Sequence, residues 1–320
     1  MLERRSFLGM AAGAAVLAAT PLRAAERLAV VATTGMIADA ARVVGGDLVT
    51  VRGLMGPGVD PHSYRQTRSD IAAMARADLV LWHGLRLEAQ LVEFMAGLGR
   101  RRPVVAVAEA LPRDRLIAHP EYPGQFDPHV WMDPALWSEV IVAVRDALGS
   151  VMPQGRAQFA ANAAAYRAEA AALRDYAAAV LQTVPAPARV LVTAHDAFGY
   201  FGRAFGFEVE GIQGISTESE AGLARMAELV ELIVTRGIRA VFVETSVSDR
   251  NIRALIEGAA ARGHRVAIGG ALFSDAMGPP GSYEGTWLGM IDHNVTTIAR
   301  ALGGDAPATG RLGRLSAAGG

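Results

Sequence analysis

One stretch near the middle of the chain restricts the fold more than any other. From Gln154 to about Thr183 alanine is frequent, and neither Gly nor Pro interrupts the run after Gly155. Alanine has the highest helix propensity, so this stretch predicts one long helix, which Pro185 and Pro187 bring to an end. The helix divides the remaining chain into two parts of similar size.

Short apolar runs of β character alternate with Ala-rich helical segments on both sides of this helix. Strands are expected at 27–32, 48–54, 79–82, 104–107, 189–193, 208–212, 240–243 and 266–268. Further helices are expected at 36–44, 69–76, 87–98, 134–148, 197–205, 220–236, 249–262 and 286–301. Strands that alternate with helices imply βαβ units and parallel sheets. The sequence therefore predicts an α/β fold with two lobes, each a parallel sheet flanked by helices, joined by the long helix.

The predicted organisation follows from these segments. The expected units are an export signal at 1–25, an N-terminal lobe at 26–152, a linking helix at 153–186, a C-terminal lobe at 187–304 and a flexible tail at 305–320. The tail is expected to be flexible because it is rich in Gly, Ala, Pro and Arg and carries no periodic apolar pattern.

The first residues have the pattern of an export signal. Two arginines, at positions 4 and 5, precede Ser, Phe and Leu, an apolar stretch follows, and small residues at 24 and 25 suit cleavage. The paired arginines resemble a twin-arginine signal, and an ordinary secretory signal is the alternative. The apolar run at 7–22 is shorter than the ~20 residues of a spanning helix. We therefore expect a periplasmic protein that does not span the membrane once mature.

Composition excludes several classes of protein. All 31 Lys+Arg residues are arginines, and with 32 Asp+Glu the formal net charge is −1, which argues against a nucleic-acid-binding protein. The sequence contains no Cys. We therefore expect no disulfide, no thiolate metal site and no lipid-modified N-terminal Cys.

Four loop positions carry side chains that bind metal ions. They are His62 in Asp-Pro-His-Ser-Tyr, His129 in Asp-Pro-His-Val-Trp, His195 in Thr-Ala-His-Asp and Asp275 in Phe-Ser-Asp-Ala-Met-Gly. His62, His195 and Asp275 each follow a predicted strand, at the end where open α/β sheets bind ligands. Two of the four fall in each predicted lobe, which predicts a site in the cleft between lobes. Three imidazoles and a carboxylate suit a divalent transition ion such as Zn²⁺ or Mn²⁺.

Two details of this predicted site follow from general chemistry. Asp60 and Asp127 each stand two residues before a histidine, and we expect them to accept the second ring N–H of a bound imidazole. Imidazole binds a metal ion only when neutral, and its ordinary pKa is ~6.5. Up to three protons should therefore compete with the ion below that pKa.

The motifs around these positions resemble those of one protein family. The segments 60–64, 127–134, 194–201 and 272–278 are similar to those of the cluster A-I metal-binding proteins, in particular the TroA type, which serve zinc and manganese ABC transporters. The similarity covers about 26–303. It implies His62, His129, His195 and Asp275 as ligands, one Mn or Zn ion as cargo, and a rigid backbone helix. It also implies a monomer whose partner is an ABC permease with its ATPase.

Two departures from the family pattern leave the metal open. Zinc-dedicated members often carry a His-rich acidic loop before the second ligand, whereas 112–125 holds only His119. Many manganese-dedicated members use Glu as the third ligand, where this chain has His195. The Ser-Asp-Ala-Met-Gly context of Asp275 favours manganese, with zinc accepted.

Two other functions fit parts of the pattern. A secreted zinc metallohydrolase would use the same ligands with Glu244 or Glu220 as general base, but four protein ligands leave little room for a catalytic water. A receptor for an iron chelate or corrinoid would line its cleft with aromatics and Arg instead of imidazoles. We therefore expect a binding protein without catalytic activity. Three residues outside the ligand set have expected roles. We expect His83 to form a hydrogen bond in a loop and Glu220 to lie at a helix N-terminus. Glu244 ends a strand and is a candidate support of the site.

Overall fold

A four-stranded parallel sheet forms the first lobe of the computed structural model, which describes residues 27–316. Its strands are β1 (Leu28–Ala32), β2 (Val49–Gly53), β3 (Leu79–Trp82) and β4 (Val104–Ala106), in the order β2-β1-β3-β4. Helices α1 (Gly35–Gly45), α2 (Arg68–Arg76) and α3 (Val92–Gly99) connect them. Val30, Val31 and Ala32 are all buried, so both faces of the central strand are covered, as parallel sheets require.

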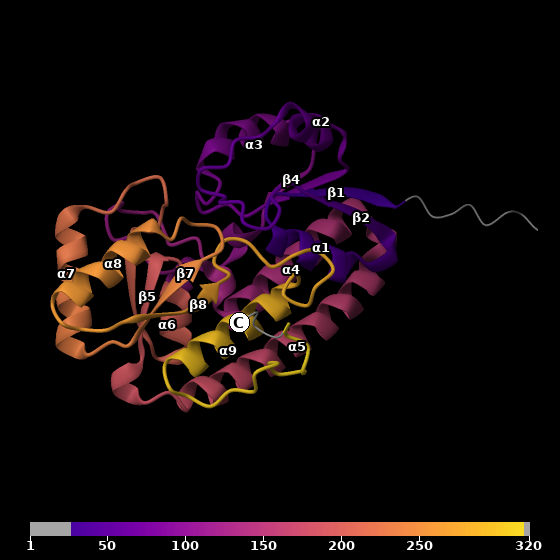
Figure 1. The fold of residues 1–320 in the computed structure, drawn as a ribbon. Coiled ribbons are helices and arrows are strands. Elements are labelled where there is room, and N and C mark those ends of the chain that lie inside the picture. The colour runs from indigo at the N-terminus through magenta and orange to yellow at the C-terminus, as the bar shows by residue number, and fades with distance from the viewer. Residues whose placement is uncertain (1–26, 317–320) are drawn as a thin grey trace, which may run out of the picture.

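The second lobe repeats this plan with two strand pairs. β5 (Val190–His195) pairs in parallel with β6 (Glu208–Gln213), and β7 (Ala240–Glu244) pairs in parallel with β8 (Ala267–Leu272). β5 and β7 lie next to each other. Its helices are α6 (Gly199–Phe205), α7 (Leu223–Arg236), α8 (Arg250–Ala261) and α9 (Trp287–Ala301). The predicted α/β fold of two lobes with parallel sheets is confirmed (Figure 1).

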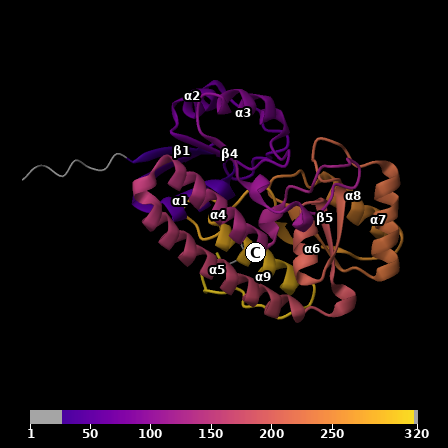
Figure 2. The same cartoon turned by 180° about the vertical axis from the view of Figure 1, so that it is seen from behind.

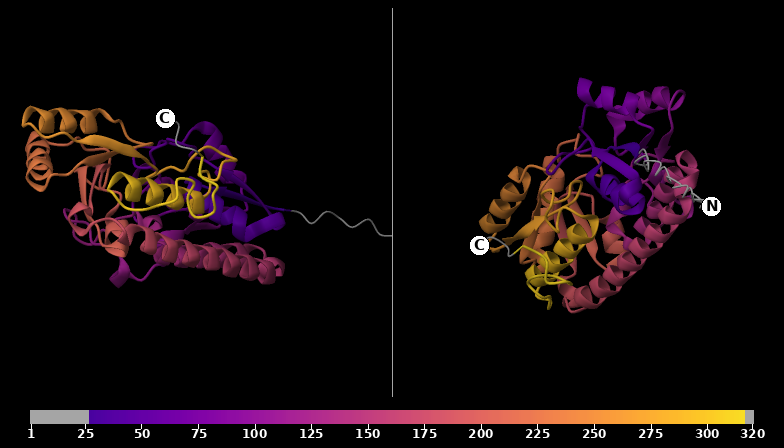
Figure 3. Two further views of the ribbon diagram at one scale, coloured as in Figure 1. Left: turned by 60° about the horizontal axis from the view of Figure 1, so that its bottom comes forward. Right: turned by 90° about the vertical axis from the view of Figure 1, so that its right-hand side faces the viewer.

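Two helices in the middle of the chain join the lobes. α4 (Pro134–Val151) begins with Pro at its first position and Asp133 accepting the Ala135 N–H, which is a strong helix start. It leads into α5 (Arg156–Gln182), which runs along both lobes (Figures 2 and 3). The buried side chains of α5 recur at intervals of three and four residues and form one apolar stripe: Phe159, Ala163, Tyr166, Ala170, Leu173 and Ala177. α5 packs on α1 and α4 of the first lobe and on α6 and α9 of the second.

One hydrophobic core continues from the first lobe into the second. It includes Val30 of β1, Trp137 of α4, Leu173 of α5 and Ile298 of α9, all at most 1% exposed. A close-packed core of this kind resists hinge bending, because any rotation of the lobes opens voids. The linkage between the lobes is therefore stiff.

This stiffness predicts how little the molecule moves on binding. Metal-free and metal-loaded protein should have the same radius of gyration within error in small-angle X-ray scattering, with changes confined to a small tilt and to loops around His195 and Asp275. A long helix linking the lobes makes a poor hinge, unlike flexible loop connections. A metal-free form with widely separated lobes would show that the shared core does not hold.

The structure corrects two sequence expectations about irregular segments. α7 begins at Leu223 with Gly222 as its cap, so Glu220 lies in the preceding loop and not at a helix N-terminus. Residues 305–316, predicted to be a flexible tail, pack on α9: Leu315 is buried, and the Arg311 N–H lies 3.0 Å from Asp292 Oδ1. The predicted export signal at 1–25 lies outside the described residues, as does 317–320. No helix within 27–316 is long and apolar enough to cross a membrane.

Candidate metal centre

The fold brings the four predicted ligands together between the lobes. His195 is the last residue of β5, and Asp275 follows β8 in the same lobe. From the first lobe, His62 lies in the turn after β2, and His129 immediately precedes a short 3-10 helix at Val130–Met132. One nitrogen or oxygen atom from each of the four lies within 4.8 Å of the others, and all four side chains are buried.

The three imidazoles face the carboxylate through their Nε2 atoms. Nε2 of His195 lies 3.1 Å from Asp275 Oδ2, and Nε2 of His129 lies 3.4 Å from Asp275 Oδ1. Nε2 of His62 lies 3.9 Å from Asp275 Oδ2 and 3.3 Å from Nε2 of His129. The donor atoms thus enclose one small volume.

Carboxylates hold two of these rings from behind. Asp127 Oδ1 lies 2.7 Å from His129 Nδ1 and also accepts the His129 main-chain N–H at 2.9 Å. Glu244, at the end of β7, plays the same part for His195: Oε2 lies 2.5 Å from Nδ1, and Oε1 accepts the main-chain N–H at 2.8 Å. Such contacts fix the ring so that Nε2 points at the ion. The structure therefore places Glu244 as a support of His195.

Asp60 departs from the sequence expectation. Its Oδ1 accepts the main-chain N–H of His62 at 2.8 Å, and Oδ2 accepts the hydroxyls of Ser63 at 2.9 Å and Thr217 at 2.6 Å. Asp60 thus holds the loop that carries His62 and does not receive the ring N–H. Both oxygens are engaged in this way, one by the loop backbone and the other by hydroxyls of its own loop and of the opposite lobe.

The electrostatics differ among the histidines. Burial lowers the pKa of His62 to about 4. Burial also opposes a charge on His129, but Asp127 and Asp275 outweigh it and raise its pKa to about 9. The pKa of His195 is raised well above its ordinary value, because Glu244 and Asp275 overcome the effect of burial. Burial would raise the pKa of Asp275, yet the neighbouring His195 and His129 hold it well below its usual range.

The hydrogen-bonding state of Asp275 tests whether these residues suit a metal ion. Both carboxylate oxygens are buried, and neither has a hydrogen-bond partner among residues 27–316. Nε2 of His195 is buried without a hydrogen-bond partner as well. Without an ion, this buried carboxylate is balanced only by protons on the facing imidazoles at 3.1 and 3.4 Å, and a bound cation would replace those protons. The donor set fits a borderline transition ion.

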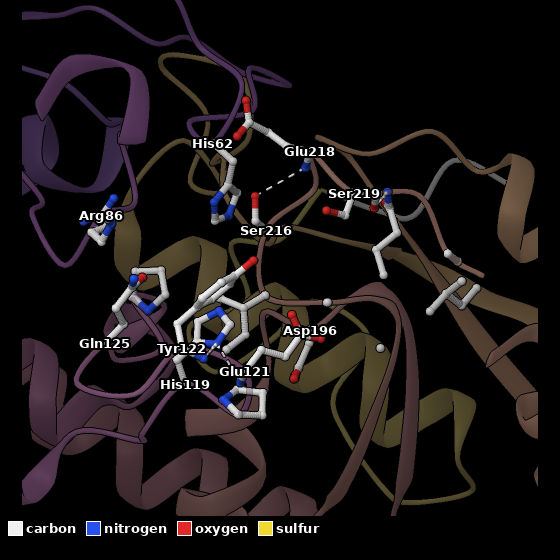
Figure 4. Close-up of a pocket in the computed structure, with 18 of the residues that line it drawn as sticks. His62, Arg86, His119, Glu121, Tyr122, Gln125, Asp196, Ser216, Glu218 and Ser219 are labelled. Carbon is white, nitrogen blue, oxygen red and sulfur yellow. Dashed lines mark hydrogen bonds between the residues drawn. The ribbon is translucent and has the colours of Figure 1, made fainter. Parts of the chain in front are cut away.

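A cavity of about 790 Å³ adjoins this centre at His62 (Figure 4). Of the four candidate ligands, only His62 lines it. The predicted loop residue His119 lies on the opposite wall, where its Nδ1 accepts the main-chain N–H groups of Glu121 and Tyr122. His119 therefore lines the cavity and lies outside the ligand cluster.

His83 supports the ligand loop from the first lobe. It is fully buried, and its Nε2 lies 2.7 Å from the carbonyl oxygen of Pro128, the residue before His129. Burial lowers the pKa of His83 to about 3, so the ring is neutral and donates this hydrogen bond. The predicted loop hydrogen bond is present.

Glu88 is a buried residue near the site that the sequence reasoning missed. Its carboxylate accepts the hydroxyl of Thr33 at 2.6 Å and the His83 N–H at 2.8 Å, and burial raises its pKa. It thereby stabilises the turn at 84–86, where φ is positive at Gly84 and at the two residues that follow it. Positive φ is costly for residues with a Cβ and requires such support. In sequence, Glu88 looks like a surface residue of the helix expected at 87–98.

Comparison with known proteins agrees with this geometry. The model of the ZnuA family, described as the periplasmic component A of the zinc-uptake complex, matches residues 30–301. The chain belongs to the ZnuA family. It is a substrate-binding protein of a metal ABC transporter, of the TroA type.

Members of the ZnuA family resemble this chain over nearly its whole length. The manganese-binding lipoprotein MntA of Bacillus subtilis is 46% identical over 87% of this chain and 90% of its own length. The zinc-binding protein TroA of Treponema pallidum is 46% identical over 85% of this chain and 88% of its own length. A solved structure of the periplasmic zinc-binding protein TroA from Treponema pallidum matches with a TM-score of 0.84 and 47% identity, covering 86% of this chain and 99% of that one.

Proposed function

We propose that the protein captures one divalent transition-metal ion between its lobes and delivers it to the permease and ATPase of an ABC transporter. The proposed ligands are His62, His129, His195 and Asp275. The observation that carries the proposal is the buried carboxylate of Asp275, which faces the Nε2 atoms of three buried imidazoles at 3.1, 3.4 and 3.9 Å. The stiff linkage suits a receptor that closes little around a small cargo.

Manganese is the favoured cargo, with zinc also bound. One ZnuA-family relative at 46% identity is named manganese-binding and another at 46% is named zinc-binding, so overall similarity does not choose between them. The segment 112–125 holds only His119, so it lacks the His-rich loop of zinc-dedicated members. The three imidazole nitrogens are also suitable ligands for Zn²⁺.

A metal-loading experiment tests the proposal. Metal-free protein exposed to excess Mn²⁺ or Zn²⁺ and then desalted should carry one ion per chain in native mass spectrometry. Protein that retains neither ion after desalting would refute the proposed cargo.

Neither glutamate considered as general base for a metallohydrolase suits that role. Glu244 holds His195, and Glu220 is exposed in the loop before α7. The relatives named above are metal-binding proteins, and another, PsaA of Streptococcus mitis, is a manganese ABC transporter substrate-binding lipoprotein. We therefore propose that the protein has no catalytic turnover.

We also propose that the protein reaches the periplasm through a twin-arginine signal and works there as a monomer. Some relatives are described as lipoproteins, whereas this sequence contains no Cys that a lipid anchor of that kind would need. The arginines at positions 4 and 5 support the twin-arginine route.

A double substitution tests the export route. Arg4→Lys combined with Arg5→Lys should block a twin-arginine pathway and leave the precursor in the cytoplasm, because that pathway reads the arginine pair. An ordinary secretory signal needs only a basic start, so it would tolerate both changes. Fractionation followed by immunoblotting measures the outcome, and normal periplasmic accumulation of the double variant would exclude this route.

A further inference from the structure

Hydrogen bonds between the lobes include buried ones at the base of the cleft, among them Tyr200 Oη to the carbonyl oxygen of Asp127 at 2.7 Å, and others at its rim. At the base of the cleft, the Trp131 indole Nε1 donates to the carbonyl oxygen of Ser274 at 2.8 Å. The Trp287 indole Nε1 donates to the main-chain carbonyl oxygen of Trp131 at 3.0 Å. These groups are buried in the shared core. At the rim, Thr217 donates to Asp60 at 2.6 Å, and Gln90 Nε2 donates to Glu218 Oε1 at 2.9 Å. Only the rim contacts can open without disturbing the core.

The rim contacts lie beside the cavity at the metal centre, and Glu218 is among the residues that line it. The loop at 214–222 forms one wall of the cavity that leads to the metal centre, and His62 lies beside it (Figure 4). Because His62 is the one proposed ligand that lines this cavity, an ion that leaves through it passes that side chain. Among the four proposed ligands, His62 is therefore the one whose loop borders this cavity.

A chain of contacts ties His62 to the opposite lobe. In the β5–β6 register, His195 is the partner of Gln213. The Gln213 amide donates to the carbonyl oxygens of Thr217 at 3.3 Å and of Ser219 at 3.0 Å, which fixes the shape of the loop. The Thr217 hydroxyl then crosses the cleft to Asp60, whose other oxygen accepts the His62 main-chain N–H.

His62 depends on this chain more than the other histidines depend on the rim. The rings of His129 and His195 lie against carboxylates of Asp127 and Glu244, which belong to their own lobes. Asp60 holds His62 only through its main chain, and Asp60 is itself held by Ser63 of its own loop and, across the cleft, by Thr217. Loss of the Thr217 hydroxyl thus loosens one ligand and leaves two in place.

We propose that Thr217 is a positioning residue that, through Asp60, keeps His62 over the ion and thereby sets the rate at which the ion leaves the cleft. This inference rests on the proposed function, since it assumes that His62 binds the ion. It assigns a role in cargo release to a hydroxyl that does not touch the ion.

Release kinetics test this role. The protein is loaded with one Zn²⁺ and mixed with excess EDTA, and release is followed by intrinsic tryptophan fluorescence, to which Trp131 contributes, its ring centroid lying 5.2 Å from that of His129. Thr217→Val keeps the shape and removes the hydroxyl, and should release Zn²⁺ roughly tenfold faster, as loss of a hydrogen bond to a charged group implies. Thr217→Ser keeps the hydroxyl and should release the ion at the wild-type rate.

Gln90→Ala is the matched control, because it removes the other rim hydrogen bond without touching the His62 loop. Its release rate should stay within about twofold of wild type. Equal acceleration in Gln90→Ala and Thr217→Val would overturn the positioning role, since any rim contact would then serve. A wild-type rate in Thr217→Val would overturn it too. Failure of wild-type protein to load one Zn²⁺ would instead refute the proposed function.

Discussion

His129→Ala should abolish tight binding of the transition ion and most of the thermal stabilisation that the ion provides. The ring is fully buried, and its Nε2 lies 3.4 Å from Asp275 Oδ1, so no other side chain takes its place without rearrangement. Even residues that only support metal ligands change affinity by about 10–100-fold when removed. We therefore expect a loss of at least ~100-fold for a direct ligand.

This loss has a calculable effect on stability. At an ion concentration ~100 times the wild-type Kd, binding adds about 2.7 kcal/mol to the free energy of unfolding, by mass action. A ~100-fold weaker variant gains only about 0.4 kcal/mol under the same conditions. Thermal unfolding with and without Mn²⁺ or Zn²⁺, together with calorimetric titration, measures both quantities.

Two further variants separate ligand loss from misfolding. Asp275→Asn is nearly isosteric, so its metal-free form should fold while its affinity for the ion drops. His119→Ala removes a histidine from the cavity wall and should match wild type, because this side chain lies outside the ligand cluster. An undiminished metal-induced rise in Tm in His129→Ala would count against the proposed site, as would an effect of His119→Ala equal to that of the ligand variants.

The affinity for the ion should rise steeply with pH, with about two protons released per ion bound near neutral pH. In the metal-free protein His129 has a pKa of about 9 and that of His195 is raised well above the ordinary value, so both rings carry a proton at pH 7. His62, with a pKa of about 4, is already neutral. Protons held by the free site are displaced by the ion, so raising the pH favours binding.

This result differs from what the sequence suggests. Three histidines with ordinary pKa values would lose up to three protons together near pH ~6.5. The buried site instead predicts about two decades of affinity per pH unit between pH 5.5 and 8, with a third proton entering only near pH ~4. Competition with a fluorescent chelator gives the slope, and calorimetry in buffers of different ionisation enthalpy counts the protons. A flat profile would mean that the histidines are not the ligands.

Much of the fold is readable from sequence because its signals are local. The run without Gly or Pro predicted a long helix, and α5 spans Arg156–Gln182 within it. The strand expected at 79–82 coincides with β3, and the other strands agree within a few residues. Helix propensity and apolar periodicity act over a few residues, so they survive in the folded protein wherever tertiary contacts do not compete.

The loop at 216–220 shows where local signals fail. Ser, Thr and Glu there resemble a helix start, but the structure uses the Thr217 hydroxyl for Asp60, which is 157 residues away. The Gln213 side-chain amide donates to two carbonyl oxygens of the same loop, and α7 begins only at Leu223. Hydrogen bonds formed across the cleft outweigh the weak preference for a helix cap.

Sequence by itself determined the parallel α/β plan, the long helix and the candidate ligands, because residue type and spacing express them directly. Only the tertiary structure decided that the ligand atoms converge on Asp275, that Glu244 holds His195, and that Asp60 reaches Thr217 and not the His62 ring. It also decided which histidines hold protons, since burial and neighbouring carboxylates shift a pKa and both depend on packing. These properties join residues from distant parts of the chain, and no local pattern encodes the distances between them.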